Sequence, residues 1–200
     1  MACLIPCSDP LVPTGARAGR AFTLIELLVV VAVLAILAAI AIPNLLEAQI
    51  RSKVSRARAD LRSLATALES YHVDNGRYPP NVVHEGIRVA PEMLTTPMAY
   101  ISSIPHDPFR TEREGDRLRR YEYHNVLELV MAGAWGWPPN DLRRYGMWRF
   151  TSLGPQREYM PWIPYDPTNG TVSAGNILRT QAAADGSIPF VYWDPAQPNI

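Results

Sequence analysis

The chain has 200 residues, and its 19 lysines and arginines are balanced by 19 aspartates and glutamates, so no charge excess indicates a nucleic-acid-binding protein. Its two cysteines, Cys3 and Cys7, lie at the start of the chain, so a chain without its leader has no disulfide framework. Proline is abundant at 19 residues, which predicts turns and irregular loops outside any long helix.

The first conspicuous element is an apolar run near the N-terminus. Residues 27–42 are sixteen consecutive apolar residues, with Glu26 just before them and Pro43 just after. Arg17 and Arg20 stand ahead of the run, and a basic leader before an apolar segment predicts membrane targeting. A helix needs about 20 residues to cross a bilayer. Residues 22–46 are long enough if Glu26 and Pro43 are tolerated.

Three interpretations of this run compete. The first is a secretory signal that is cut after the small-x-small sequence Ala39-Ile40-Ala41. The second is a plain membrane anchor. The third is a signal that is cut ahead of the run, so that the helix is kept. A carboxylate inside a membrane segment is costly and by default indicates a functional site. Glu26 therefore needs a role in any interpretation that keeps the helix.

The residues around Glu26 favour the third interpretation. The sequence Ala-Phe-Thr-Leu-Ile-Glu at residues 21–26 resembles the cleavage and methylation motif of type IV pilins and type II secretion pseudopilins. The resemblance implies cleavage between Ala21 and Phe22, methylation of the Phe22 amine, and a retained acid at Glu26. It also implies that Pro43 is a helix-kinking proline. The family usually has glycine where this chain has Ala21.

The freed amine of Phe22 gives Glu26 a physical role. A carboxylate in lipid is costly unless it is paired or protonated, and a neighbouring subunit's Phe22 amine can pair with it in a filament. Such a pair would set the axial register of subunits. The alternative is an acid that snorkels to the membrane edge without a partner.

After Pro43 the helical pattern continues but becomes amphipathic. Seven apolar residues recur at alternating spacings of four and three and predict one apolar stripe: Ile50, Val54, Ala57, Leu61, Leu64, Leu68 and Tyr71. Asn75-Gly76 followed by prolines predicts the end of the helix. One helix over residues 22–73 would be about 75 Å long. We expect the C-terminal part of the chain to cover the stripe.

Basic residues gather on the rest of this helix. They are Arg51, Lys53, Arg56, Arg58 and Arg62, with Asp60 as the one acid among them. Without interleaved aromatic residues they indicate a face that is solvated or turned to lipid head groups, not a nucleic-acid site.

Beyond the helix we predict a loop-rich α+β domain. Residues 91–94 are expected to form a helical turn, residues 119–129 a strand or short helix, and residues 147–153 and 189–193 strands. Two to four antiparallel strands would then pack on the apolar stripe of the long helix.

Several short motifs extend the resemblance towards the major pseudopilins. Residues 71–79 resemble the end of their long helix, residues 107–109 and 121–123 their Asp-Pro-aromatic and Tyr-x-Tyr pieces, and residues 152–154 their Ser-x-Gly turn. Residues 130–145, with Trp135 and Trp137, form a longer connection than a compact pseudopilin has.

Some major pseudopilins bind calcium in a loop after the Ser-x-Gly turn, and residues 165–177 occupy the comparable place. Asp166, Thr168, Asn169 and Ser173 offer oxygen ligands there. Calcium prefers six to eight oxygens with several carboxylates, and this loop has one carboxylate. A plain structural turn is therefore the favoured interpretation, and calcium stays the alternative. No other cofactor is expected.

No catalytic motif is recognisable, so we do not expect an enzyme. The four histidines, His72, His84, His106 and His124, are expected to be surface or capping groups. Clustered tryptophans more often fill a core or an interface than a ligand groove. We therefore expect Trp135, Trp137, Trp148, Trp162 and Trp193 to be core residues.

Together these observations predict a pseudopilus subunit of a type II secretion system, in four segments. Residues 1–21 would be a removed leader, 22–46 a transmembrane segment, 47–76 an amphipathic continuation and 77–200 a periplasmic domain. The protein would span the inner membrane once with its leader in the cytoplasm. The resemblance implies as partners a prepilin peptidase, other pilin-like subunits in a homo-oligomeric filament, and an inner-membrane assembly platform with an ATPase.

Two alternatives stay open. One is a type IV pilin or minor pilin that acts in adhesion, motility or DNA uptake, although the disulfide-closed loop common in pilins is excluded by the cysteine positions. The other is a secreted soluble binding domain cut after Ala41. The sequence does not show what is secreted.

Overall fold

The computed structural model describes residues 22–111, 115–169 and 173–187. The chain divides into two compact units, Met1–Ile42 and Pro43–Ile200. The long helix α1, Leu24–Asn75, contributes its first nineteen residues to one unit and the remainder to the other. The predicted 22–73 helix is thus confirmed to within two residues at either end.

Helix α1 begins and ends where the local chemistry predicts. Thr23 precedes its first residue, and Gly76 follows its last with a φ of 67°, a conformation that suits glycine. The Gly76 N–H donates to the carbonyl of His72 at 2.8 Å, which satisfies one of the free carbonyls of the last turn. Pro43 lies inside the helix, and the predicted kink there stays a prediction.

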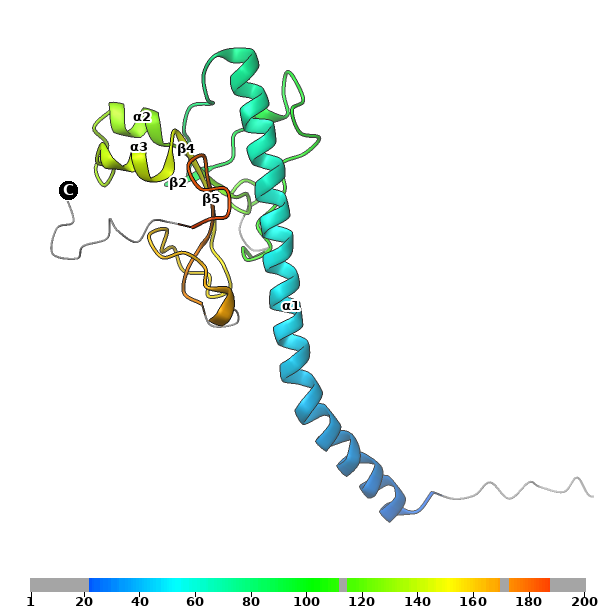
Figure 1. Cartoon of the computed structure of the whole chain (residues 1–200). Coiled ribbons are helices and arrows are strands. Elements are labelled where there is room, and N and C mark those ends of the chain that lie inside the picture. The colour runs from blue at the N-terminus through cyan, green and yellow to red at the C-terminus, as the bar shows by residue number, and fades with distance from the viewer. Residues whose placement is uncertain (1–21, 112–114, 170–172, 188–200) are drawn as a thin grey trace, which may run out of the picture. The chain divides into compact units, whose positions relative to one another are not determined.

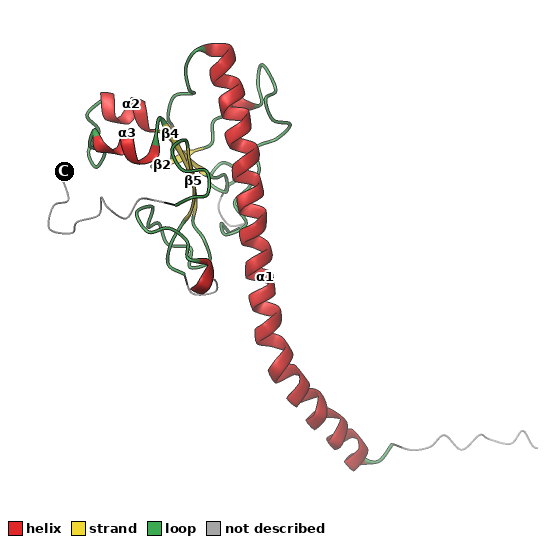
Figure 2. Ribbon diagram, viewed as in Figure 1, coloured by secondary structure: helices red, strands yellow, loops and turns green. Residues whose placement is uncertain are grey.

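The second unit contains a five-stranded antiparallel sheet whose strands are adjacent in chain order. Figure 2 draws the strands in yellow. The strands are β1 Val82–His84, β2 Ile87–Val89, β3 Glu122–Asn125, β4 Trp148–Ser152 and β5 Ile177–Thr180. The short helices are η1 Glu92–Leu94, α2 Val126–Met131, α3 Asn140–Tyr145 and η2 Pro167–Asn169 (Figure 1).

The apolar stripe of α1 forms the main core with one face of the sheet. Its middle five residues are at most 5% exposed, and Ile50 and Tyr71 pack against the same cluster at its two ends. The sheet contributes Tyr123, Trp148 and Phe150, and the residue before β3 contributes Tyr121. The predicted cover for the stripe is therefore confirmed. Burial of one leucine side chain such as Leu64 contributes about 2 kcal/mol to such a core.

Glu69 accepts hydrogen bonds that connect the C-terminal part of α1 to the sheet and to the segment after the helix. One carboxylate oxygen accepts from Trp148 Nε1 at 2.7 Å, and the other accepts from the Tyr78 hydroxyl at 3.0 Å. Burial, together with the bond to Glu69, raises the pKa of Tyr78 to about 12. The Gln181 side-chain amide donates to the same hydroxyl at 2.9 Å, which brings in the residue after β5.

A buried carboxylate organises the connections at the other end of the sheet. Asp107 accepts hydrogen bonds from the Phe109 and Leu153 amides and from the Ser152 hydroxyl, at 2.9 to 3.0 Å. The Asp-Pro-Phe and Ser-x-Gly motifs are therefore joined in space. Burial raises the pKa of Asp107, and these donors with Arg110 oppose that rise.

Some of the elements predicted beyond the long helix are confirmed, and others are not. The helical turn at 91–94 is confirmed as η1, residues 119–129 contain both a strand and a short helix, and residues 147–153 contain β4. The expected strand count of two to four is wrong, since the described residues already form a sheet of five. β1, β2 and β5 have only three or four residues each, too few for an alternating pattern to stand out. The predicted strand at 189–193 lies outside the described residues.

Candidate functional site

The first unit presents an apolar surface with no protein cover. Leu24, Leu34, Ile36 and Ile40 are each more than half exposed, and the most apolar 18-residue window of α1 has a mean hydropathy of 3.1 with none of it buried. Among the described residues, α1 is the one helix long and apolar enough to cross a membrane, although a signal sequence near the N-terminus passes the same test. A continuous apolar surface of this kind requires lipid or partner helices.

Thr23 and Glu26 form a capping box at the start of that surface. The Thr23 hydroxyl accepts from the Glu26 amide at 3.3 Å, while the Glu26 carboxylate accepts from the Thr23 amide at 2.9 Å and from its hydroxyl at 2.7 Å. This reciprocal arrangement satisfies two of the free donors at a helix N-terminus. Glu26 therefore has a structural role within its own chain.

The capping box changes how the predicted role of Glu26 is understood. The predicted pairing partner was the Phe22 amine of a neighbour, but one carboxylate oxygen already holds two donors of its own residue Thr23. Glu26 and Phe22 are both exposed, so a further donor has access. The spacing Thr-x-x-Glu is itself the signature of a capping box, so the sequence carries a signal for this interaction. Ala21, on the other side of the predicted cut, lies outside the described residues.

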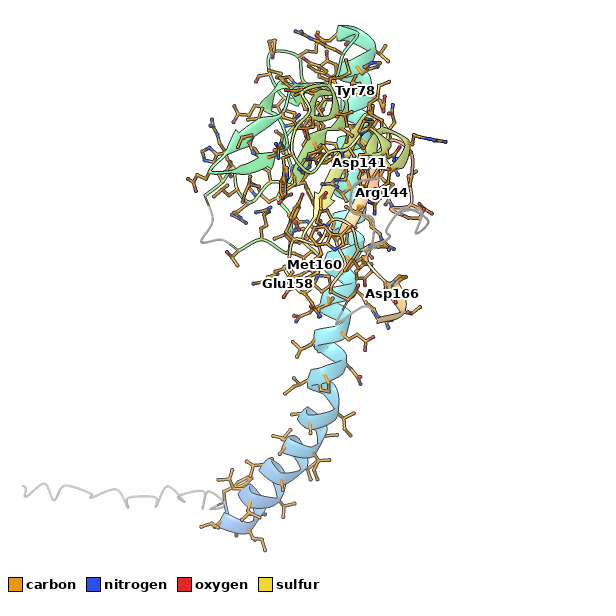
Figure 3. All side chains as sticks on the ribbon, turned by 90° about the vertical axis from the view of Figure 1, so that its left-hand side faces the viewer. Tyr78, Asp141, Arg144, Glu158, Met160 and Asp166 are labelled. Carbon is orange, nitrogen blue, oxygen red and sulfur yellow. The ribbon has the colours of Figure 1, made fainter. Side chains whose placement is uncertain are left out.

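The predicted calcium loop is held by a turn of its own. Asp166 Oδ1 accepts from the Thr168 amide and hydroxyl at 2.8 and 2.6 Å, and the Asp166 amide donates to the Ser173 hydroxyl at 3.0 Å. Three of the four predicted ligands thus meet, and Asn169 lies in η2 beside them. In Figure 3 Asp166 lies towards the end of the unit opposite Tyr78. Within the part of the chain that is described, no three His, Cys, Asp or Glu side chains cluster as for a metal.

Two expectations about single residues are wrong. His124 is not a surface group: it is 3% exposed on β3, because its ring lies against Trp137 at 5.0 Å between centroids. Trp148 is a core residue as predicted, but Trp135 is 99% exposed and Trp162 is 44% exposed. Trp137 packs against the smaller core cluster, so among the tryptophans of the irregular connections Trp135 and Trp162 are the ones that do not reach a core, and Trp193 lies outside the described residues.

The basic residues of α1 are all exposed, as expected for a solvated or lipid-facing helix side. Arg51 pairs with Glu47 at 2.5 Å and Arg56 with Asp60 at 3.8 Å, each one helical turn away. The Arg58 guanidinium lies over the ring of Tyr165, 5.5 Å from its centroid. Part of the positive charge of this helix side is therefore balanced by neighbouring acids or lies against an aromatic ring.

Known protein families match residues in both units. Residues 44–133 match the family model of type II secretion system protein G, and residues 17–42 match that of the prokaryotic N-terminal methylation motif. The chain is 33% identical over 130 residues to the type II secretion system core protein G of Pectobacterium carotovorum subsp. carotovorum, covering 61% of this chain and 80% of the relative.

Two other relatives match the chain over very different shares of their length. The core protein G of Escherichia coli strain K12 is 28% identical over 138 residues, which are 64% of this chain and 92% of the relative. The type IV major pilin protein PilA of Myxococcus xanthus is 54% identical over 59 residues, but these are 30% of this chain and 27% of the pilin. No solved structure matches the chain.

Proposed function

Since this chain belongs to the type II secretion system protein G family, we propose that it is a structural subunit of a pseudopilus that supports protein export. The observation that carries the proposal is the uncovered apolar segment of α1, which begins with a methylation motif and continues into a helix packed on a small sheet. Subunits would assemble through the apolar segment, with the second unit on the filament surface. The role is mechanical, and we assign no catalytic residue.

Continuity of α1 supports retention of the apolar segment. A cut after Ala41 would fall inside the helix, between the uncovered part and the part that packs on the sheet. A cut between Ala21 and Phe22 would instead fall ahead of Thr23, so the capping box would be kept whole. We therefore propose processing by a prepilin peptidase and methylation of Phe22.

The mature N-terminus tests this processing directly. Mass spectrometry of the protein purified from membranes is expected to find a chain that begins at methylated Phe22. A chain that begins at Ile42 would contradict the filament proposal and support a secreted soluble domain. The matched control is Ala21→Gly, which places the family's usual residue before the cut and should leave the start unchanged.

Before assembly, the subunit would span the inner membrane once. Arg17 and Arg20 would hold the leader in the cytoplasm, which puts the second unit in the periplasm. Extraction from the membrane then needs an external source of work, which an inner-membrane assembly platform and its ATPase would supply. Cysteine-accessibility labelling at exposed Ser70 would test the orientation, with labelling from the periplasm as the expected result.

We propose that assembly exchanges the partners of Glu26. The carboxylate is bonded to Thr23 of its own chain, and it has lone pairs left for the Phe22 amine of a neighbour. Glu26→Gln keeps the size and one acceptor oxygen but removes the charge. We expect this variant to be processed and inserted but not assembled, as judged by shearing and immunoblotting of filaments. Glu47→Gln removes the charge of a half-exposed acid farther along α1, which pairs only with Arg51 of its own helix among the described ion pairs, and serves as the control.

The similarity to a Myxococcus type IV major pilin favours a second candidate function, a pilin. Complementation distinguishes the two functions. We expect this chain to restore secretion in a strain that lacks its own protein G, and not to restore pili in a strain that lacks its major pilin. The opposite pattern would support the pilin.

A further inference from the structure

The sheet has a second buried face, and it is polar. On β3 and β4 the aromatic residues of the main core alternate with Glu122, His124, Arg149 and Thr151, which therefore point to the other face. Glu122 lies directly opposite Thr151, and His124 lies opposite Arg149. All four are between 1% and 7% exposed. Buried polar groups are costly unless they find partners, so this face needs an explanation.

The two largest charges on this face have partners. Glu122 pairs with Arg110 at 2.6 Å, and both side chains are buried. Arg149 donates to the Tyr159 hydroxyl at 3.1 Å, and its guanidinium lies 4.8 Å from the ring centroids of both Trp137 and Tyr145. The exposed connection before α3 thus contributes one of the two rings that hold Arg149.

Some buried polar atoms on the same face have no hydrogen-bond partner among the described residues. They include His124 Nδ1, Thr151 Oγ1 and the Nε of Arg149. An unpaired buried polar group costs about 1–3 kcal/mol, and in folded proteins it commonly indicates bound water or another missing ligand. His124 is the most informative, because burial, with the charges of Arg149 and Arg88, lowers its pKa well below the usual value. A neutral imidazole can still donate one hydrogen bond.

A hollow of about 370 Å³ adjoins this polar face. Its polar lining consists of three arginines, one acid, the histidine and a tyrosine: Arg88, Arg110, Arg157, Glu122, His124 and Tyr159. Arg88 and Arg157 make no ion pair with any described residue, whereas Glu122 is already bonded to Arg110. The lining therefore has a net positive charge whether or not Glu122 is ionised.

Arg157 stands at the accessible side of the hollow. It is exposed, and its φ of 59° is unusual for a residue other than glycine. The turn that sets this conformation is closed by the Arg157 amide, which donates to the Gly154 carbonyl at 3.1 Å. Glu158 and Met160 in Figure 3 locate this segment on the second unit. A guanidinium fork matches the oxygens of a carboxylate, sulfate or phosphate.

We propose that this hollow binds a small oxyanion, which Arg88 and Arg157 hold by charge and His124 contacts from the buried side. The anion would neutralise part of the excess positive charge and supply an acceptor for the unpaired imidazole nitrogen. Its oxygens come from one of two sources, a free inorganic anion or an acidic side chain of a second copy of this chain. Both present the same chemistry to the arginines.

The test uses the full-length chain in detergent micelles. Inorganic phosphate is titrated by calorimetry, with sodium chloride at equal ionic strength as the blank. For a free-anion site we expect binding that Arg157→Gln weakens about 10-fold, the loss of one charge-assisted hydrogen bond. Arg157→Lys keeps the charge but not the fork and should lie between the two. Arg62→Gln, which removes an exposed arginine elsewhere, should bind as the original chain does.

Sedimentation of the same variants distinguishes the second source. If phosphate does not bind, but Arg88→Gln and Arg157→Gln weaken self-association while Arg62→Gln does not, the anion is a carboxylate of a second copy. Because Arg157 is exposed, its substitution should not prevent folding. The proposal is overturned if phosphate acts no more strongly than chloride and self-association is the same in all variants.

Discussion

The two parts of α1 share one backbone conformation but have opposite surroundings. In residues 24–42 nearly every side chain is exposed, and the apolar residues encircle the helix. In residues 50–71 the large apolar residues keep to one stripe, which is buried against the sheet, while the other sides are mostly polar. Helical periodicity thus distinguishes a segment whose apolar face packs within its own chain from a segment whose apolar surface needs lipid or other copies of the chain.

The largest expected difference between the two parts comes from shortening a leucine in each. Leu64 is fully buried, so Leu64→Ala leaves a cavity and should lower the free energy of unfolding of the second unit by about 2–5 kcal/mol. Leu34 is 58% exposed, and Leu34→Ala should leave that free energy unchanged. Urea unfolding of the chain in detergent, followed by tryptophan fluorescence, measures both. An equal loss in both variants would show that the two parts of α1 unfold as one core.

A second difference is pH dependence, which we expect from the buried polar face behind the second part of α1. His124 has a lowered pKa in the folded chain, so the unfolded chain binds the additional proton first as the pH falls through about 6.5. Protonation therefore destabilises the fold below that pH, by up to about 2 kcal/mol at pH 5.

A comparison of variants separates the contribution of His124 to the pH dependence of stability from the contribution of the buried acids. Burial raises the pKa of Asp107 and of Glu122, so those groups act in the opposite direction. We expect the stability of His124→Gln to fall less than that of the original chain between pH 7.5 and pH 5. The slope is compared, since the substitution itself costs stability at every pH. Parallel curves would mean that His124 is not buried as a neutral group.

The difference between the two parts of α1 was predictable from sequence because it depends on local order. The heptad from Ile50 to Tyr71 and the stop at Gly76 depend on neighbouring residues only, and both are confirmed. The pairing of β5 with β4 was not predictable, because four-residue strands carry little pattern and their partner lies 25 residues or more away. Burial of His124 was missed for a similar reason, since the covering Trp137 comes from an irregular connection.

A smaller effect is expected at the first turn of α1. Thr23→Ala removes the two hydroxyl contacts of the capping box, keeps the bond from the residue 23 amide to Glu26, and should cost about 1 kcal/mol of local helix stability. Thr66 is the matched control in the second part, where its hydroxyl donates to the Arg62 carbonyl and alanine is a better helix former. Hydrogen exchange by mass spectrometry should be faster over residues 24–27 in Thr23→Ala only. Unchanged exchange there would show that the membrane mimic, and not Thr23, fixes the first turn.

The smallest effect is expected at the loop beside the second part of α1, where Arg58 lies over Tyr165. One carboxylate oxygen of Asp166 already accepts hydrogen bonds from Thr168, and Asp166 is the one acid among the four predicted calcium ligands. We therefore expect 1 mM calcium to leave the melting temperature of the chain unchanged relative to a chelator. Asp166→Asn keeps an acceptor for the turn and should lose less stability than Asp166→Ala, which should lose about 1 kcal/mol. A rise of several degrees with calcium, lost in Asp166→Asn, would instead establish the metal site, because only the charge of the carboxylate distinguishes that variant.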